Sequence, residues 1–190
     1  MAYDVVGESM RLIGSRELTP VTRLSRRRRH AAMAVDVVDD MAVTVFARRS
    51  VGGNVEETHV FVRRAGGWVP LGGGGGPLDD DALEHRPAQL PPGWPGETTG
   101  VDPRVLALDG SGGVLDSGAT WFGSIRGRWI NHAIVRVNAD VARLVVDDRQ
   151  IEVPWHGRCV VLWPGRRRSQ DVVAVAGDGG RLGRVTLPSS

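Results

Sequence analysis

Short stretches that alternate apolar and polar residues recur along most of this chain, and this pattern limits the folds open to it. In residues 32–46 an alternating run is interrupted at Asp39-Asp40 and resumes through Val43 and Val45. A side-chain period of two is typical of a β-strand, so this segment is predicted to be a β-hairpin. The same reasoning predicts strands at 58–64, 68–71, 105–108, 114–115, 121–138, 142–146, 150–155, 158–163, 171–176 and 184–187.

Helical spacing is confined to the amino-terminal region. Apolar residues recur every three or four positions between Asp4, a predicted N-cap, and Gly14, a predicted C-terminal stop, so a helix is expected over about residues 4–13. A second short helix is expected from Thr19-Pro20, because Pro suits the first helical position.

These elements predict a mainly β protein, an antiparallel β-sandwich or partly open barrel with one or two short N-terminal helices. The alternative is an α+β first half, in which a curved sheet folds over the helices like a cone, followed by a β-sandwich second half.

The chain divides into two strand-rich parts. Residues 1–78 form the helix and β-meander, which is predicted to end in a flexible run of five glycines at 72–76. Residues 79–103 are rich in Pro and acidic residues and have little periodicity, so they are predicted to be a connector. Residues 104–190 are predicted to be a β-sandwich subdomain, with a turn at 109–113.

Composition excludes several protein classes. The 190 residues are 41% hydrophobic and 24% charged, which is typical of a folded globular protein. All 24 basic residues are Arg, yet the net charge is only +2, so net charge predicts no polyanionic partner. The arginine runs at 26–29 and 166–168 could contact phosphates, but no aromatic residues interleave with them. The expectation is therefore against nucleic acid, without excluding it.

The cysteine count and the hydropathy of the sequence predict where the protein is located in the cell. Cys159 is the only cysteine, so no intrachain disulfide can form and a reducing cytoplasm is expected. Neither a secretory signal nor an apolar stretch of about 18 residues is present, so no membrane association is expected.

Motifs that hold cofactors are incomplete. Residues 72–76 lack the Lys-Ser/Thr of a phosphate loop, and residues 177–183, which imitate a dinucleotide fingerprint, lie between two strands. Residues 109–113 lack the ligands of a calcium loop. The five histidines have no His or Cys at the spacing typical of zinc sites. We therefore expect no metal and no cofactor.

No catalytic residue can be assigned from the sequence. Glu57 and His59 share one face of a predicted strand, as a carboxylate that orients an imidazole would, but a surface ion pair is the favoured interpretation. Cys159 lies in an apolar strand and is predicted to be a core residue instead of a nucleophile.

The candidate contact surface lies on the predicted strand that begins at Trp121. On the strand predicted from residue 121, Trp121 projects to one face, whereas Phe122, Arg126 and Arg128 project to the other. Arg beside aromatic residues is typical of protein interfaces, so these four residues are the candidates for partner contact. The competing interpretation is a strand buried on both faces with Arg at its rim.

The sequence thus favours a cytoplasmic, non-enzymatic protein-interaction module that binds a partner protein through a sheet face or edge. The alternative is a small-molecule isomerase or cyclase with a shape-selective cavity in a β-barrel or cone. A cavity of ligand size would favour the enzyme, and an exposed apolar face would favour the module. Oligomeric state is not predicted.

Overall fold

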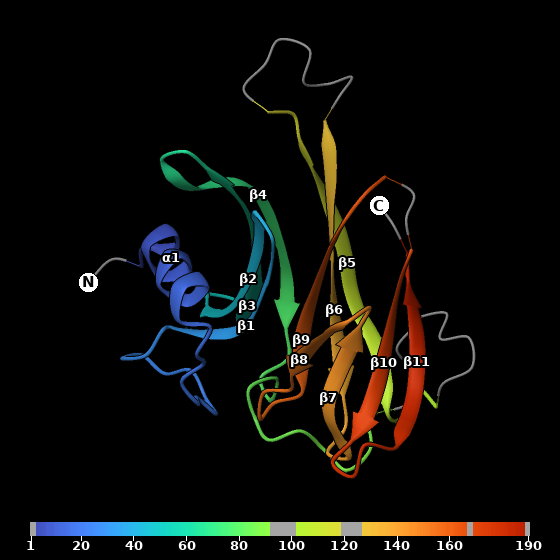
Figure 1. Ribbon diagram of the computed structural model, residues 1–190. Coiled ribbons are helices and arrows are strands. Elements are labelled where there is room, and N and C mark those ends of the chain that lie inside the picture. Colours follow the sequence, from blue (N-terminus) through green and yellow to red (C-terminus); the bar gives the residue numbers. More distant parts are fainter. Residues whose placement is uncertain (1–2, 92–101, 119–126, 167–168, 189–190) are drawn as a thin grey trace.

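The computed structural model describes residues 3–91, 102–118, 127–166 and 169–188 (Figure 1). The protein is mainly β, with 56% strand and 7% helix, which confirms the predicted fold class. Its elements are α1 (Val5–Ser15), β1 (His30–Val38), β2 (Met41–Arg49), β3 (Asn54–Arg64), β4 (Gly67–Leu78), β5 (Leu106–Asp116), β6 (Arg128–Val137), β7 (Val141–Val146), β8 (Arg149–Glu152), β9 (Arg158–Pro164), β10 (Gln170–Ala176) and β11 (Arg181–Leu187).

The strands form three antiparallel sheets, and none of them closes into a barrel. Sheet A has the order β1-β2-β3-β4, sheet B the order β5-β6-β9, and sheet C the order β11-β10-β7-β8. Helix α1 covers the outer face of sheet A, and sheets A, B and C follow one another as layers (Figure 1).

Sheet B is buried on both faces. Val160 and Leu162 of β9 pack into the core shared with sheet A, whereas Cys159, Val161 and Trp163 pack into the core shared with sheet C. Two-sided burial explains why this strand is a continuous apolar run in the sequence. The prediction that Cys159 is a core residue is confirmed, and burial raises the pKa of its thiol to about 12.

The core between sheets A and B contains residues from both parts of the chain. Met33, Val43 and Val60 come from sheet A, and Ile130 and Ile134 come from sheet B. The boundaries at 1–78, 79–103 and 104–190 stay a prediction.

Helix α1 begins as predicted but ends later. The Asp4 side chain accepts a hydrogen bond from the Gly7 amide at 3.1 Å, which makes Asp4 the N-cap. The helix passes Gly14 and ends at Ser15, and its C-cap, Arg16, has a left-handed backbone (φ 57°) and donates its N–H to the Leu12 carbonyl. No described helix is long and apolar enough to cross a membrane.

The predicted second helix is wrong, because residues 16–29 have no regular structure. Val21 and Leu24 are buried in the core between sheets A and B, so their three-residue spacing reflects two anchors of a loop. The Arg26–Arg29 run is exposed, and like charges three positions apart do not favour a helix.

The prediction that residues 72–76 form a flexible end of the meander is also wrong. Strand β4 continues through all five glycines and pairs with β3, from Val60 opposite Gly72 to Glu56 opposite Gly76. A neighbouring strand supplies the hydrogen bonds that fix this backbone, although glycine has a low intrinsic strand preference.

Residues 109–113 were predicted to be a turn, and this prediction is wrong as well. They lie inside β5, which pairs with β6 along its length. The register shifts between Leu108 and Gly110, so Asp109 occupies a bulge. Both glycine runs therefore belong to edge strands, β4 at the edge of sheet A and β5 at the edge of sheet B.

The first part of the predicted connector is anchored. Leu83 and Leu90 are buried, the Trp155 indole donates to the Leu83 carbonyl at 2.9 Å, and the Arg86 amide donates to the Trp155 carbonyl at 2.9 Å. Residues 92–101 lie outside the described residues.

Candidate binding site between two sheet edges

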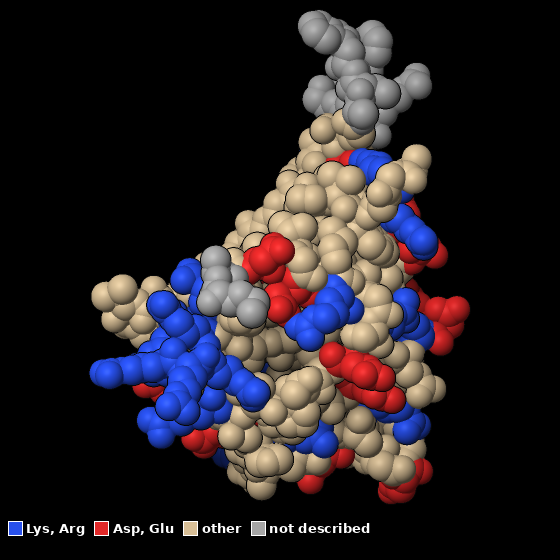
Figure 2. Space-filling view, turned by 90° about the vertical axis from the view of Figure 1, so that its left-hand side faces the viewer, with Lys and Arg blue, Asp and Glu red and all other residues tan. Residues whose placement is uncertain are grey.

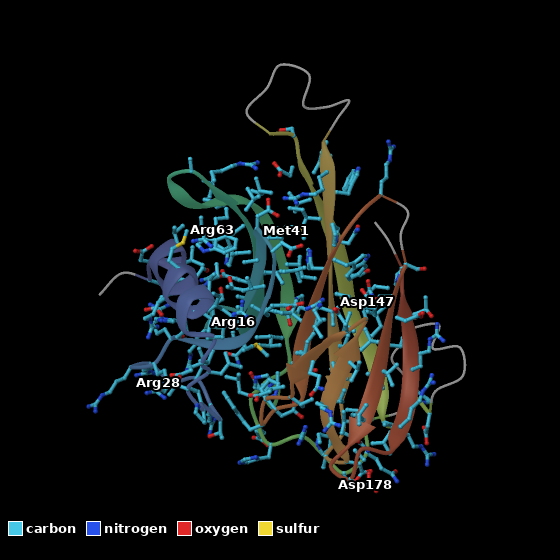
Figure 3. All side chains as sticks on the ribbon, viewed as in Figure 1. Arg16, Arg28, Met41, Arg63, Asp147 and Asp178 are labelled. Atoms are coloured by element: carbon cyan, nitrogen blue, oxygen red, sulfur yellow. The ribbon has the colours of Figure 1, made fainter. Side chains whose placement is uncertain are left out.

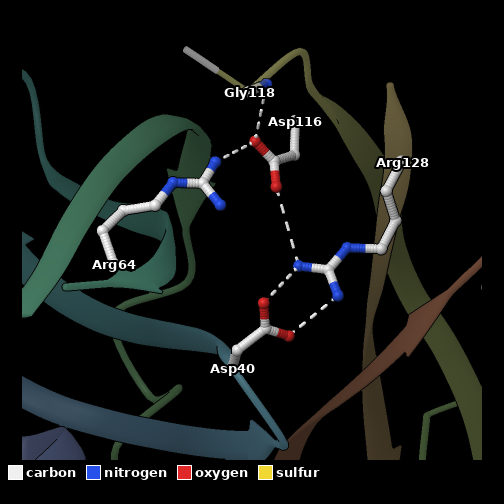
Figure 4. Close-up of polar contacts among 5 residues, drawn as sticks. All are labelled: Asp40, Arg64, Asp116, Gly118 and Arg128. Atoms are coloured by element: carbon white, nitrogen blue, oxygen red, sulfur yellow. Dashed lines mark hydrogen bonds and ion pairs between the residues drawn. The ribbon is translucent and has the colours of Figure 1, made fainter. Parts of the chain in front are cut away.

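The predicted contact strand is described only in part. Trp121, Phe122 and Arg126 lie outside the described residues. The Arg128 guanidinium donates two hydrogen bonds of 2.8 Å to the Asp40 carboxylate in the β1–β2 turn (Figure 4). The contact surface stays a prediction.

Arg128 also belongs to a larger ion-pair network. Its Nη2 lies 3.6 Å from Asp116 of β5, which also pairs with Arg64 (Figure 4). Hydrogen bonding to Arg128 lowers the pKa of Asp40. Arg128 therefore joins β6 to sheet A and to β5, and it remains 36% exposed.

Glu57 and His59 do share one face of β3, but no hydrogen bond orients the imidazole. His59 Nε2 lies 4.0 Å from Glu57 Oε2, whereas Glu57 Oε1 accepts a 2.5 Å hydrogen bond from Arg48 Nε. Burial lowers the pKa of His59. This arrangement is an Arg48–Glu57 ion pair with a neutral imidazole beside it.

Basic side chains gather on the amino-terminal face (Figure 2). Arg23 and Arg26–Arg29 are exposed in the loop after α1, where Arg28 points outward (Figure 3). The chain leaves β9 at Pro164 at the opposite end of the molecule (Figure 1). The described part of the second arginine run, Arg166, therefore does not extend this surface.

A cleft of about 380 Å³ lies between the glycine-rich edges β4 and β5. Residues opposite each other on paired strands project to the same face. Gly74 is opposite Thr58, and Gly76 is opposite Glu56, so both glycines face the cleft. On the other wall, Gly110 and Gly112 face it in the same way. At these four positions the walls carry no side chain of their own.

The polar floor of the cleft is centred on Arg158 of β9. Its side chain is 6% exposed and forms an ion pair with Asp109 in the β5 bulge. The Arg158 guanidinium also lies 3.9 Å from Glu56 Oε2 and 3.7 Å from Asp79 Oδ2. One buried cation is therefore shared by three carboxylates.

Burial changes the proton affinities of these groups. It raises the pKa of Glu56 to about 7, against the opposing effect of Arg158. It also raises the pKa of Asp109. Glu56 accepts no side-chain hydrogen bond from the described residues and, unlike the exposed Asp79, its carboxylate is largely removed from water.

His132 completes the floor. Its ring packs against Gly112, where a Cβ would lie 2.9 Å from the His132 Cε1, so position 112 has no room for a side chain. Burial lowers the pKa of His132, and its Nδ1 has no hydrogen-bond partner among the described residues. The imidazole is neutral at pH 7.

A second cavity, of about 600 Å³, lies between β1 and β8. Asp36 in its wall accepts hydrogen bonds from Arg149 Nη1 at 2.5 Å and from the Leu162 amide at 2.8 Å. Arg149 also donates to the Leu162 carbonyl at 2.6 Å. These groups satisfy one another and join the three sheets, so this wall is structural.

No group of three or more His, Cys, Asp or Glu side chains within the described ranges could hold a metal ion. No protein-family model, curated protein or solved structure matches this chain. What the cleft can do must therefore be argued from its own geometry.

Proposed function

We propose that this protein is a non-enzymatic binding module that takes a segment of a partner protein into the cleft between β4 and β5. The observation that carries the proposal is that two glycine-rich edge strands of different sheets lie on opposite sides of one cleft. An edge strand presents unpaired N–H and C=O groups to which an added strand can hydrogen bond. Glycine inside a strand often marks a place where another backbone approaches closely.

A sheet face has less support as the binding surface. The large apolar side chains that are exposed in the described ranges are Val6, Val51, Val69 and Leu182, and they lie on separate elements. They form no contiguous patch of the kind that marks an interface. We place the interaction in the cytoplasm, because the one cysteine is buried and cannot form an intrachain disulfide.

The test is to fill the cleft without disturbing the fold. A Cβ at position 74 meets no atom within 4 Å, so Gly74→Val should fold normally while its side chain blocks the cleft. The probe is a pool of end-blocked random pentapeptides, titrated while the amide NMR signals of residues 72–76 and 110–113 are followed. We expect shifts in the wild type and at least a tenfold loss of affinity in Gly74→Val.

The control is Gly177→Val, at a glycine in the β10–β11 turn that also has free space around it. This variant should bind the pool as the wild type does. If both valine variants bind equally well, or if no pool moves the glycine signals of the wild type, the proposal is wrong.

A second candidate function is proton transfer on a small molecule, as in an isomerase or cyclase. Its support is Glu56, whose pKa of about 7 suits a general base, next to the buried Arg158 guanidinium. Deuterium incorporation from D₂O into dihydroxyacetone, present in the wild type and absent in Glu56→Gln, would favour this function. Equal incorporation in the two proteins would count against it.

A further inference from the structure

We propose that the occupant of the cleft is an extended basic segment, which pairs with β4 and β5 together and directs an Arg or Lys side chain at Glu56. This inference rests on the proposed function and specifies the partner's chemistry. It draws on two independent features of the cleft, the backbone of its walls and the charge of its floor.

The walls define the shape of the occupant. A Cβ at Gly72 would lie 3.5 Å from both methyl groups of Val114, so β4 and β5 approach each other at this end. Cβ atoms at Gly74, Gly76 and Gly110 would meet nothing within 4 Å, so the cleft is open beyond that contact. An extended backbone can lie there between two edges, and it would join sheets A and B through hydrogen bonds.

The charged floor lies at this open end. Glu56 is opposite Gly76 on the paired strand, and Asp109 directly precedes Gly110. Asp79 is one residue beyond the end of β4. A segment that enters the open end therefore meets the carboxylates first.

The charge balance selects a basic side chain. Arg158 is the only cation lining the described cleft, and it is committed to Asp109 by an ion pair. Glu56 Oε2 lies 3.9 Å from Arg158 Nη1, beyond hydrogen-bond distance. The Glu56 side chain is 15% exposed, so a bound group can reach it. A guanidinium or ammonium group could form with Glu56 the charge-assisted hydrogen bond that the floor does not supply. An acidic segment would add a fourth carboxylate.

The protonation state of Glu56 should make the affinity for a basic segment depend on pH. The groups that act on Glu56 are Arg158, which favours its ionised form, and Asp109, which opposes it. Asp79 also lies at the rim, Arg136 acts on Asp109, and His132 faces the cleft as a neutral ring. Because a bound cation requires Glu56 to be ionised, affinity should rise from pH 6 to pH 8.

The experiment compares two end-blocked pentapeptide pools, with Arg or Gln at the centre and random residues at the other four positions. The Arg pool should shift the amide signals of both 72–76 and 110–113 and should bind about tenfold more tightly than the Gln pool. In Glu56→Gln this preference should fall below twofold. Glu84→Gln, an exposed Glu→Gln change outside the cleft, should keep it.

Each other result overturns a specific part of the inference. Equal affinity of the Arg and Gln pools at both pH 6 and pH 8 in the wild type would exclude the basic residue and leave the proposed function standing. Binding of arginine amide as tight as that of the Arg pool would exclude the strand pairing. Failure of every pool would exclude both this inference and the proposed function. The comparison within the wild type holds even if Glu56→Gln does not fold.

Discussion

Glu56 is the residue on which the charge of the cleft depends. Its side chain projects to the same face of β3 as the buried Thr58 and Val60 and is only 15% exposed, and the nearest cation is shared with Asp109 and Asp79. A buried carboxylate that is poorly neutralised favours its protonated form. This explains why the pKa of Glu56 is raised, although Arg158 is close.

The raised pKa predicts how Glu56 affects stability. In the folded protein Glu56 keeps its proton up to about pH 7, whereas in the unfolded chain it loses the proton near pH 4.5. The free energy of unfolding should therefore fall, through this group, as pH rises from about 4.5 to about 7. Glu56→Gln removes the fall, so its stability relative to the wild type should increase over this range by up to about 3 kcal/mol.

Urea unfolding at pH 5, 6, 7 and 8 measures this difference. Other groups also make stability depend on pH. His156, whose pKa is lowered to about 4 by burial, makes the free energy of unfolding rise with pH, and this contribution cancels when variant and wild type are compared at the same pH. Glu84→Gln, an exposed change outside the cleft, is measured in parallel as the control. A difference for Glu56→Gln that stays constant with pH would show that this carboxylate is not buried in the folded state.

The sequence drew attention to Glu57 and gave no signal for Glu56. Glu57 shares a strand face with His59, which alternation along one strand makes readable from the sequence, and a surface ion pair was the favoured interpretation. Glu56 projects to the opposite face and acquires its role from Asp109 and Arg158, which are far away along the chain. Only the packing of sheet A, which contains β3, against sheet B, which contains β5 and β9, brings these groups together.

At the scale of elements, β4 has two kinds of glycine. Gly73 and Gly75 are required by close approach, since a Cβ at position 75 would lie 2.2 Å from the Glu56 carbonyl oxygen. Gly74 and Gly76 face free space, so the fold does not require them there. Glycines that the fold does not require are a cost in strand stability, which points to a function.

This difference predicts opposite effects of the same substitution. Gly75→Ala should destabilise the protein by about 1–3 kcal/mol, because the methyl group forces β3 and β4 apart. Gly74→Ala should be neutral or stabilising by up to about 1 kcal/mol, because it restricts only the unfolded chain. Urea unfolding of both variants distinguishes them, and equal losses would mean that β4 does not pair with β3 as described.

The glycine strands were also the elements that sequence reasoning missed. Alternation requires side chains, and a run of five glycines has none, so residues 72–76 gave no strand signal. Both glycine-rich runs follow directly on a predicted strand, but so does the glycine-rich run that begins at Gly177, which is a turn, so this position in the sequence does not identify a strand. By contrast, the β1–β2 hairpin around Asp39-Asp40 was predicted correctly, because apolar alternation marks both of its strands.

At the scale of the molecule, the three sheets are joined by a few buried polar contacts. His156 Nδ1 accepts a hydrogen bond from the Arg158 amide, so its Nε2–H donates to the Met33 carbonyl, at 3.1 Å, and links the turn before β9 to β1. Asp36 and Arg149 connect the same region to sheet C. The sequence predicted the sheets in outline, because their strands have apolar patterns. It could not predict the stacking order, which depends on contacts more than 100 residues apart.

If β4 and β5 are two free edges that receive one strand, amide hydrogen exchange should report the binding on both of them. In the free protein, the outward N–H groups of residues 72–76 and 110–113 should exchange rapidly, because no strand of the described ranges covers them. With a saturating pool of blocked pentapeptides, exchange should slow on both strands together, while β8, one of the two edges of sheet C, should be unaffected. Bound peptide that leaves the exchange of both glycine runs unchanged, or that protects only one of them, would contradict the claim.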